Sequence, residues 1–172
     1  IQFHRYGPVV LTREIARTQS SLEIARLTEN IPTLVSTLMD SGAKPGFITN
    51  LMTSMCDSAT VQLIKLGIKE LGQPPADFAF LALGSQGRQE QTLITDQDNG
   101  IIYNPDDDSD QEKTSQYFLQ LGAYVCEGLN EAGYLYCKGK VMANNPRWCR
   151  SLKEWIRGVS EWTHELEPQE VI

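Results

Sequence analysis

The N-terminal part of the chain carries apolar side chains at helical spacing. Across residues 12–71 they recur mostly at every third or fourth position, which places them on one face of a helix. Pro32 is expected to divide or kink this stretch, and the Ser-Gly pair at 41–42 to end its first half. The Pro-Gly pair at 45–46 predicts a turn before a second helical run. We therefore predict an N-terminal helical segment over residues 1–72.

The second part of the chain contains short apolar runs of strand length. Phe78–Leu83 (FAFLAL) is bounded by turn-forming residues, which is typical of a buried strand. Asn99–Tyr103 (NGIIY) predicts a second strand, and Tyr134–Met142 is a candidate for a third. Together these patterns indicate an α+β (α/β) core over residues 73–172, in which helices flank a small mixed sheet.

Two further helices are expected between and after these strands. Ser109 and Glu112 have the spacing of a capping box, and the helix that follows is expected to close at Gly133. Asn144 or Asn145 can cap the last helix, with Pro146 in its first turn. That helix would carry an apolar seam, for which a packing contact is favoured over a binding stripe: Trp148, Leu152, Trp155, Val159, Trp162 and Leu166.

Composition and charge narrow the range of partners. The net charge is −7 with no Lys/Arg cluster, so we expect no nucleic-acid partner, which a basic patch usually attracts. No apolar run is long enough to cross a bilayer, and no membrane partner is expected. The 4 cysteines form no C-x-x-C pair, which favours free, mostly buried thiols and a cytoplasmic location. Because the chain begins with Ile1, it is expected to be a piece of a longer protein.

Two carboxylates precede the second predicted strand. Residues Asp96 and Asp98 are two positions apart, and in an extended chain such residues point to one face, with Cα atoms roughly 6.5 Å apart. Both can then converge on Mg²⁺, which prefers oxygen ligands and keeps substrate phosphates in its shell. Two such ions about 3.5–4 Å apart can activate an attacking oxygen and stabilise a leaving one. The two residues are thus candidate metal ligands and catalytic residues.

A Gly-Ser pair follows the first predicted strand. Gly84 permits a tight turn and a close approach of the backbone to a ligand, and Ser85 adds a hydroxyl donor. If the next residues form a helical turn, its free N–H groups face a phosphate. Arg88 can balance phosphate charge, although Arg88 and Glu90 could equally be a surface pair.

The segment that carries these features is GSQGRQEQTLITDQDN, residues 84–99. It resembles the signature of the polymerase-β-like nucleotidyltransferase superfamily. It is very similar to a nucleotidyltransferase family related to the N-terminal domain of protein-PII uridylyltransferase, whose members often follow CBS or cyclic-nucleotide-binding domains. The resemblance continues in VMANNPRW and SLKEW, and it covers most of the chain, from about residue 12 to residue 162.

This resemblance implies roles for individual residues. Gly84 and Ser85 match the phosphate-holding pair, and Asp96 and Asp98 match the metal-binding carboxylates. Arg88 matches an arginine that we expect to contact phosphate. The implied cofactor is Mg²⁺, and the implied substrate is a nucleoside triphosphate.

Three neighbouring polar residues are expected to support the site. Glu90 is assigned to orienting Arg88 or the loop, and Gln86 and Gln97 to shaping the loop.

The chain departs from the superfamily pattern at one point. The superfamily usually supplies a third carboxylate from a later strand, but Tyr134–Met142 contains no Asp or Glu. We expect that carboxylate, and a C-terminal helical domain, to lie beyond residue 172, so full activity is expected to need more than this piece.

Three functional hypotheses follow from the sequence. The first is a Mg²⁺-dependent transfer of a nucleoside monophosphate from ATP or UTP to an acceptor hydroxyl, by analogy one on a signalling protein. The second is a regulatory module that senses a nucleotide without turnover. The third is a purely structural interaction domain that uses the tryptophan seam.

Overall fold

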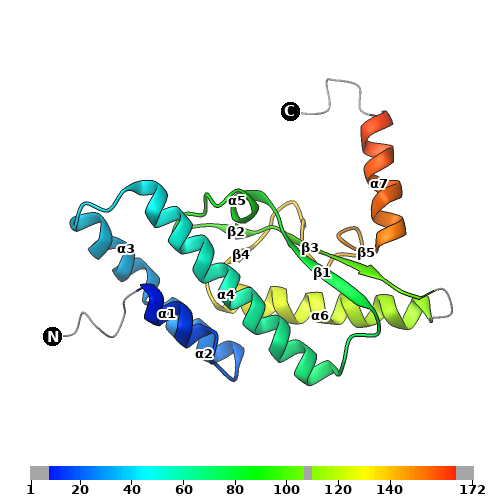
Figure 1. Cartoon of the computed structure of the whole chain (residues 1–172), viewed down its shortest axis with the longest axis horizontal. Helices are drawn as coiled ribbons and strands as arrows, with labels where there is room; N and C mark the ends of the chain where they lie inside the picture. Colours follow the sequence, from blue (N-terminus) through cyan, green and yellow to red (C-terminus); the bar gives the residue numbers. More distant parts are fainter. Residues whose placement is uncertain (1–7, 107–109, 166–172) are drawn as a thin grey trace.

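A three-stranded sheet and a separate pair of short strands lie among the helices (Figure 1). The computed structural model describes residues 8–106 and 110–165. Strand β1 (Asp77–Ala82) pairs antiparallel with β3 (Asn99–Asn104), and β3 pairs parallel with β5 (Cys149–Ser151). Strand β2 (Asp96–Gln97) pairs parallel with β4 (Leu135–Tyr136). This small mixed sheet with flanking helices confirms the predicted α+β class.

In the described part of the chain, four helices precede the sheet. The expected turn at 45–46 is wrong, because Pro45 and Gly46 form the first turn of the long helix. Proline suits that position, since its fixed φ is helical and its missing N–H needs no partner there. Pro32 likewise lies in the first turn of a helix, so the chain is divided near it, as predicted. The four helices are α1 (Pro8–Ile15), α2 (Ser21–Thr28), α3 (Ile31–Asp40) and α4 (Pro45–Leu71).

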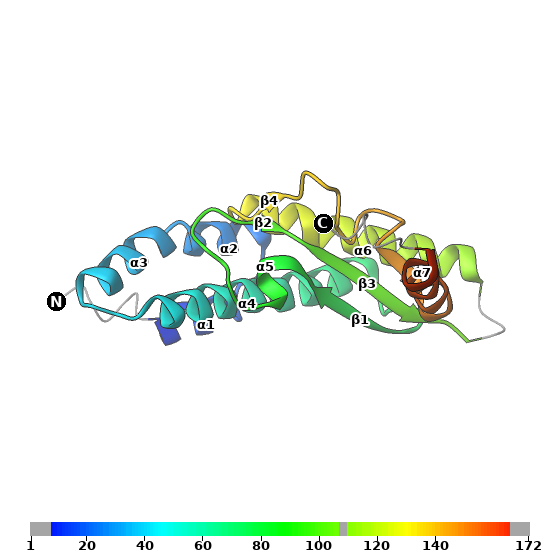
Figure 2. The ribbon, with the colours of Figure 1, turned by 90° about the horizontal axis from the view of Figure 1, so that it is seen from above.

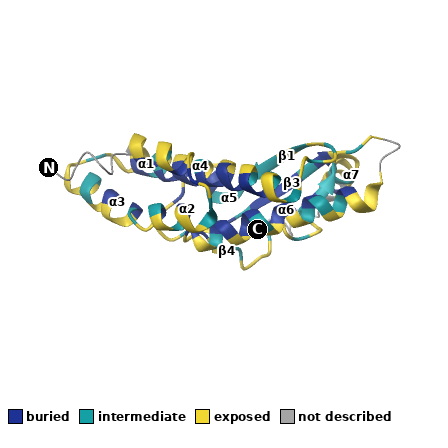
Figure 3. Ribbon diagram, turned by 90° about the horizontal axis from the view of Figure 1, so that it is seen from below, coloured by how far each residue is buried: buried dark blue, intermediate teal, exposed yellow. Residues whose placement is uncertain are grey.

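The core lies where α4 and α6 (Gln111–Glu131) pack together beside the strands, and Figure 3 shows buried residues concentrated there. The two helices approach closely because Gly128 has no side chain, and a Cβ at that position would overlap Leu63. Phe118 of α6 stacks on Tyr103 of β3 with ring centroids 4.7 Å apart, and its ring also contacts Phe78 of β1 at 5.2 Å. These contacts fix α6 against the sheet.

The start of α6 differs in part from the prediction. Ser109, the expected cap, lies outside the described residues. Asp110 is the residue before the helix, and its side chain accepts a hydrogen bond from Lys113 N at 3.2 Å. Gly133 follows the helix with φ +94°, the left-handed conformation expected of a closing glycine.

The last helix, α7 (Leu152–Glu165), begins later than Asn144 or Asn145, so this part of the prediction is wrong. Trp148 N donates to Asn145 O at 2.8 Å in a turn, and the next residues form β5 because the edge of β3 offers backbone partners. Ser151 and Glu154 then form the true capping box, in which Glu154 accepts from the Ser151 N–H at 3.0 Å and its hydroxyl at 2.7 Å.

The tryptophan seam is consequently not one helical face. Trp148 precedes α7, and the side chains of residues 162 and 166 lie outside the described part of the chain. Trp155 Nε1 donates to Ile101 O at 3.0 Å and attaches α7 to the sheet. Figure 2 shows α7 toward the opposite end of the molecule from α3.

The third predicted strand, over 134–142, forms only the two residues of β4, and these pair with β2 outside the main sheet. A turn ends β4, in which Lys140 N donates to Cys137 O at 3.0 Å and Lys140 takes φ +55°. Among the described residues, no helix has both the length and the apolar character of a membrane span. The division of the chain at residue 72 stays a prediction.

Candidate functional site

Hydrogen bonds on the inner face of the segment that joins β2 to β3 decide where the aspartates point. The amide of Gln97 is buried and donates to the carbonyls of Cys126 at 2.9 Å and Tyr134 at 3.1 Å. Asn99 is also buried, and its Oδ1 accepts from Ala143 N at 2.7 Å. Because side chains alternate along an extended chain, the residues on either side of Gln97 face outward.

The outward-facing residues are Asp96 and Asp98, and Cys137 from the end of β4 lies beside them. One ligand atom of each of the three side chains lies within 4.8 Å of the others. The structure thus brings the two predicted metal-binding residues together on one side. Sequence reasoning missed Cys137, because only the pairing of β2 with β4 brings this part of the candidate third strand to the aspartates.

Gly84 begins α5 (Gly84–Gly87), and Asp98 packs directly against it. Gly84 has φ +53°, and a Cβ built there would overlap Oδ2 of Asp98 and lie 2.9 Å from its Cγ. The backbones are also joined, since Leu83 N donates to Asp98 O at 2.9 Å. Glycine is therefore required both by the backbone conformation and by the space that the carboxylate fills.

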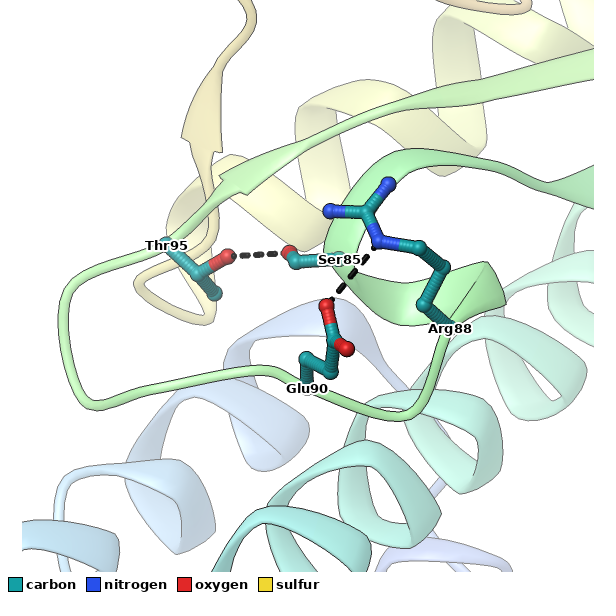
Figure 4. Close-up of polar contacts among 4 residues, drawn as sticks. All are labelled: Ser85, Arg88, Glu90 and Thr95. Carbon is teal, nitrogen blue, oxygen red and sulfur yellow. Dashed lines mark hydrogen bonds and ion pairs between the residues drawn. The ribbon is translucent and has the colours of Figure 1, made fainter.

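Ser85 is linked to the strand that carries the aspartates. Its Oγ lies 3.1 Å from Oγ1 of Thr95, the residue before Asp96, as Figure 4 shows. Gln86, in the same turn, is buried and donates to Asp57 Oδ1 of α4 at 2.8 Å. The short turn is thus anchored to α4 on one side and to Thr95 on the other.

Arg88 and Glu90 form an ion pair on the surface. Arg88 Nε lies 2.9 Å from Glu90 Oε2, and each side chain is 64% exposed (Figure 4). Gln89 between them has φ +59°, which turns the chain sharply. Arg88 follows the Gly-Ser turn closely in sequence, and in the structure its Nε is paired with Glu90.

Within the described part of the chain, neither Asp96 nor Asp98 forms an ion pair with a basic side chain. Burial raises the pKa of the Cys137 thiol, and its hydrogen bond with Asp98 raises the pKa further. A protonated thiol beside two carboxylates leaves local negative charge that a metal cation can neutralise.

An open hollow of about 660 Å³ adjoins this cluster through Cys137. Lys138 and Lys140 contribute to its wall, as do Tyr136 and Asn144. Two cationic side chains and an aromatic ring are thus grouped at one side of the aspartates, in a chain whose net charge is −7.

The structure thus places a Gly-Ser turn after one strand and paired aspartates beside it before the next. The resemblance of residues 84–99 to nucleotidyltransferases predicts this arrangement. The chain belongs to the family described as "Putative nucleotidyltransferase DUF294", whose model matches residues 29–169. At the general level this is a family of nucleotidyl transfer. No curated protein and no solved structure matches the chain.

Proposed function

We propose that this chain carries the nucleotide-binding half of a Mg²⁺-dependent nucleotidyltransferase site. In the proposed reaction, an acceptor oxygen attacks the α-phosphorus of a nucleoside triphosphate and pyrophosphate leaves. The observation that carries the proposal is the convergence of Asp96 and Asp98 beside Gly84. The family match supports it independently, because it covers most of the chain and includes every residue of the site.

The two aspartates are the proposed metal ligands. Their oxygens are the ligand type that Mg²⁺ prefers, and neither carboxylate is engaged by a basic side chain among the described residues. The space at Gly84 also suits a carboxylate that must face outward. A bound Mg²⁺ would supply positive charge that stabilises the phosphates during transfer.

The Gly-Ser turn is the proposed phosphate contact. Ser85 can donate its hydroxyl to a phosphate oxygen once it turns from Thr95, 3.1 Å away. The anchor between Gln86 and Asp57 holds the turn in place, so little order has to be created on binding. Arg88, released from Glu90, would add charge-assisted hydrogen bonds.

The hollow beside Cys137 is the proposed position for the rest of the nucleotide. Its exposed aromatic ring, Tyr136, can lie against a base, and Lys138 and Lys140 can attract the triphosphate. For the acceptor we propose a hydroxyl on a protein, by analogy with uridylylation of a signalling protein. That part rests on the family resemblance described above, and the proposed donor is an ATP- or UTP-like nucleoside triphosphate.

The proposed function is tested by binding and turnover. Isothermal titration with ATP, UTP and Mg²⁺ should show metal-dependent nucleotide binding that Asp96→Asn with Asp98→Asn abolishes. Asp106→Asn is a matched control, because Asp106 is an exposed acid on the loop after β3. Circular dichroism should show that all variants stay folded.

The binding titration, together with an assay of pyrophosphate release, separates the rival functions. Pyrophosphate release in the presence of Mg²⁺ would support transfer. Nucleotide binding without pyrophosphate release would indicate the sensing module instead. Equal nucleotide affinity in wild type and in the double aspartate variant would overturn both proposals.

A further inference from the structure

The strand pairing next to the site places a sulfur ligand among the carboxylates. Strands β2 and β4 run parallel in a register that sets Asp96 opposite Leu135 and Gln97 opposite Tyr136. Both strands end there, and the residues that follow them, Asp98 and Cys137, have ligand atoms within 4.8 Å of each other. The thiol thus joins the two carboxylates.

Hydrogen bonds hold the backbone that follows Cys137, and the pairing of β4 with β2 holds the backbone before it. Asn99 N donates to Val141 O at 3.0 Å, and Lys140 N donates back to Cys137 O at 3.0 Å. The thiol is half-buried, whereas the other described cysteines, Cys56, Cys126 and Cys149, are buried. Cys137 is therefore fixed beside the aspartates and remains accessible to a small ion.

The three ligand atoms have a spacing that one cation can use. Their mutual separations are at most 4.8 Å, and ligand atoms around one zinc-sized ion are roughly 3–4 Å apart. The donor set of two carboxylates and one thiol is mixed, and Mg²⁺ has little affinity for sulfur, whereas Zn²⁺ and Co²⁺ accept both kinds of ligand.

We propose that Cys137 is a third ligand of the cation held by Asp96 and Asp98, so that this site binds borderline, thiol-accepting cations such as Zn²⁺ and Co²⁺ more tightly than Mg²⁺. The inference rests on the proposed function for the role of the two aspartates. It adds a third ligand and an order of metal affinities, while the proposed reaction still uses Mg²⁺. A cation bound in this way joins β2 to the turn after β4, next to the hollow assigned to the nucleotide.

The test uses Co²⁺ as a spectroscopic probe, without nucleotide. Wild-type protein titrated with Co²⁺ should develop a near-ultraviolet sulfur-to-cobalt charge-transfer band. Cys137→Ser should abolish the band and weaken Co²⁺ binding at least about tenfold, while Mg²⁺ affinity changes less than about twofold. Asp96→Asn with Asp98→Asn should also remove the band, because the thiol alone cannot hold the ion.

A control variant distinguishes Cys137 from the other cysteines. Cys149→Ala removes a buried thiol on β5 and should leave the band unchanged. Should Cys137→Ser fail to fold, the wild-type protein still gives an answer. Co²⁺ should then slow alkylation of Cys137, followed by mass spectrometry, whereas the same concentration of Mg²⁺ should not.

The other possible outcomes distinguish a failure of the role of Cys137 from a failure of the proposed function. Mg²⁺ and nucleotide binding that depends on the aspartates, without a cobalt–sulfur band, would overturn the role of Cys137 and leave the proposed function standing. A band that survives the double aspartate substitution would place the sulfur site elsewhere and also overturn it. If the wild-type protein bound neither metal nor nucleotide, both the role of Cys137 and the proposed function would be overturned.

Discussion

The carboxylate of Asp98 occupies the space that a side chain at Gly84 would need. Gly84 also takes φ +53°, so two separate reasons require glycine here. The first reason is the left-handed backbone conformation, which disfavours a side chain at any position. The second is the steric overlap with Asp98, which concerns only this pair of residues. The two contributions can be separated experimentally, because the chain contains another left-handed glycine in open space.

Gly84→Ala should therefore displace Asp98 as well as strain the backbone. We expect a loss of about 1–2 kcal/mol in unfolding free energy from the left-handed conformation, with an added loss from the overlap. Metal affinity measured by titration should fall too. Gly42→Ala is the control, since Gly42 has φ +79° and nothing within 4 Å of a built Cβ. Equal losses of stability, with metal binding intact in both, would show that Asp98 does not depend on this space.

Ser85→Ala should weaken triphosphate binding more than nucleoside binding. A hydrogen bond to a charged phosphate is lost in the first case only, which corresponds to roughly a tenfold change in affinity. Ser58→Ala is the matched control, because that hydroxyl donates to Ser54 O within α4 at 2.9 Å. Calorimetry with ATP and adenosine compares the two ligands. Equal losses for both would contradict a phosphate contact.

Gln97→Met should destabilise the fold although the two side chains have similar volume. Gln97 is 1% exposed, and its loss leaves the carbonyls of Cys126 and Tyr134 without this donor. We expect about 1–3 kcal/mol less unfolding free energy in urea denaturation. The exposed Gln120→Met on α6 should change it little. If Gln97→Met lowered the unfolding free energy as little as the control does, the hydrogen bonds of Gln97 would not fix β2.

Glu154 should contribute stability only when it is ionised. Its hydrogen bonds from Ser151 lower its pKa from the ordinary value of 4.5, the side-chain bond being the larger cause. A lowered folded-state pKa means that the stabilisation is complete above the unfolded pKa and is lost as the pH falls through the folded one. Glu154→Gln should thus reduce unfolding free energy at pH 7 and match the wild type in strong acid.

The check for Glu154 is urea denaturation across the acid range. Glu161→Gln, an exposed acid on the same helix, serves as the control for general charge effects. If the unfolding free energies of Glu154→Gln and the wild type differed by the same amount at every pH, ionisation of Glu154 would not be the source of the stabilisation.

The thiols should differ sharply in reactivity. Burial raises the pKa of Cys56 and Cys149 to about 12 and that of Cys126 to about 11, so these thiols stay protonated at neutral pH and are shielded from solvent. The half-buried Cys137 should react first with a thiol reagent in native protein, and faster as the pH rises because more thiolate forms. Mass spectrometry after brief labelling identifies the site. Early labelling of Cys126 would contradict the packing of α6.

The sequence alone determined which segments form the two long helices and the strands β1 and β3, because apolar patterning indicates where helices and strands form. The expected burial holds for β3 but is wrong for β1, in which every residue is at least partly exposed. The sequence also indicated the residues of the candidate site, since Gly-Ser and Asp-x-Asp express local backbone requirements. It could not locate β5, because a three-residue edge strand is formed by the hydrogen-bonding groups that β3 offers rather than by a pattern of its own.

Only the tertiary structure decided which residues meet at the site. The two aspartates are side by side because Gln97 and Asn99 are bonded inward to α6 and to the loop after β4, which are distant in sequence. Cys137 joins them through the register of β2 with β4. Such contacts depend on how separate segments pack in space, and no local pattern of residues specifies that packing.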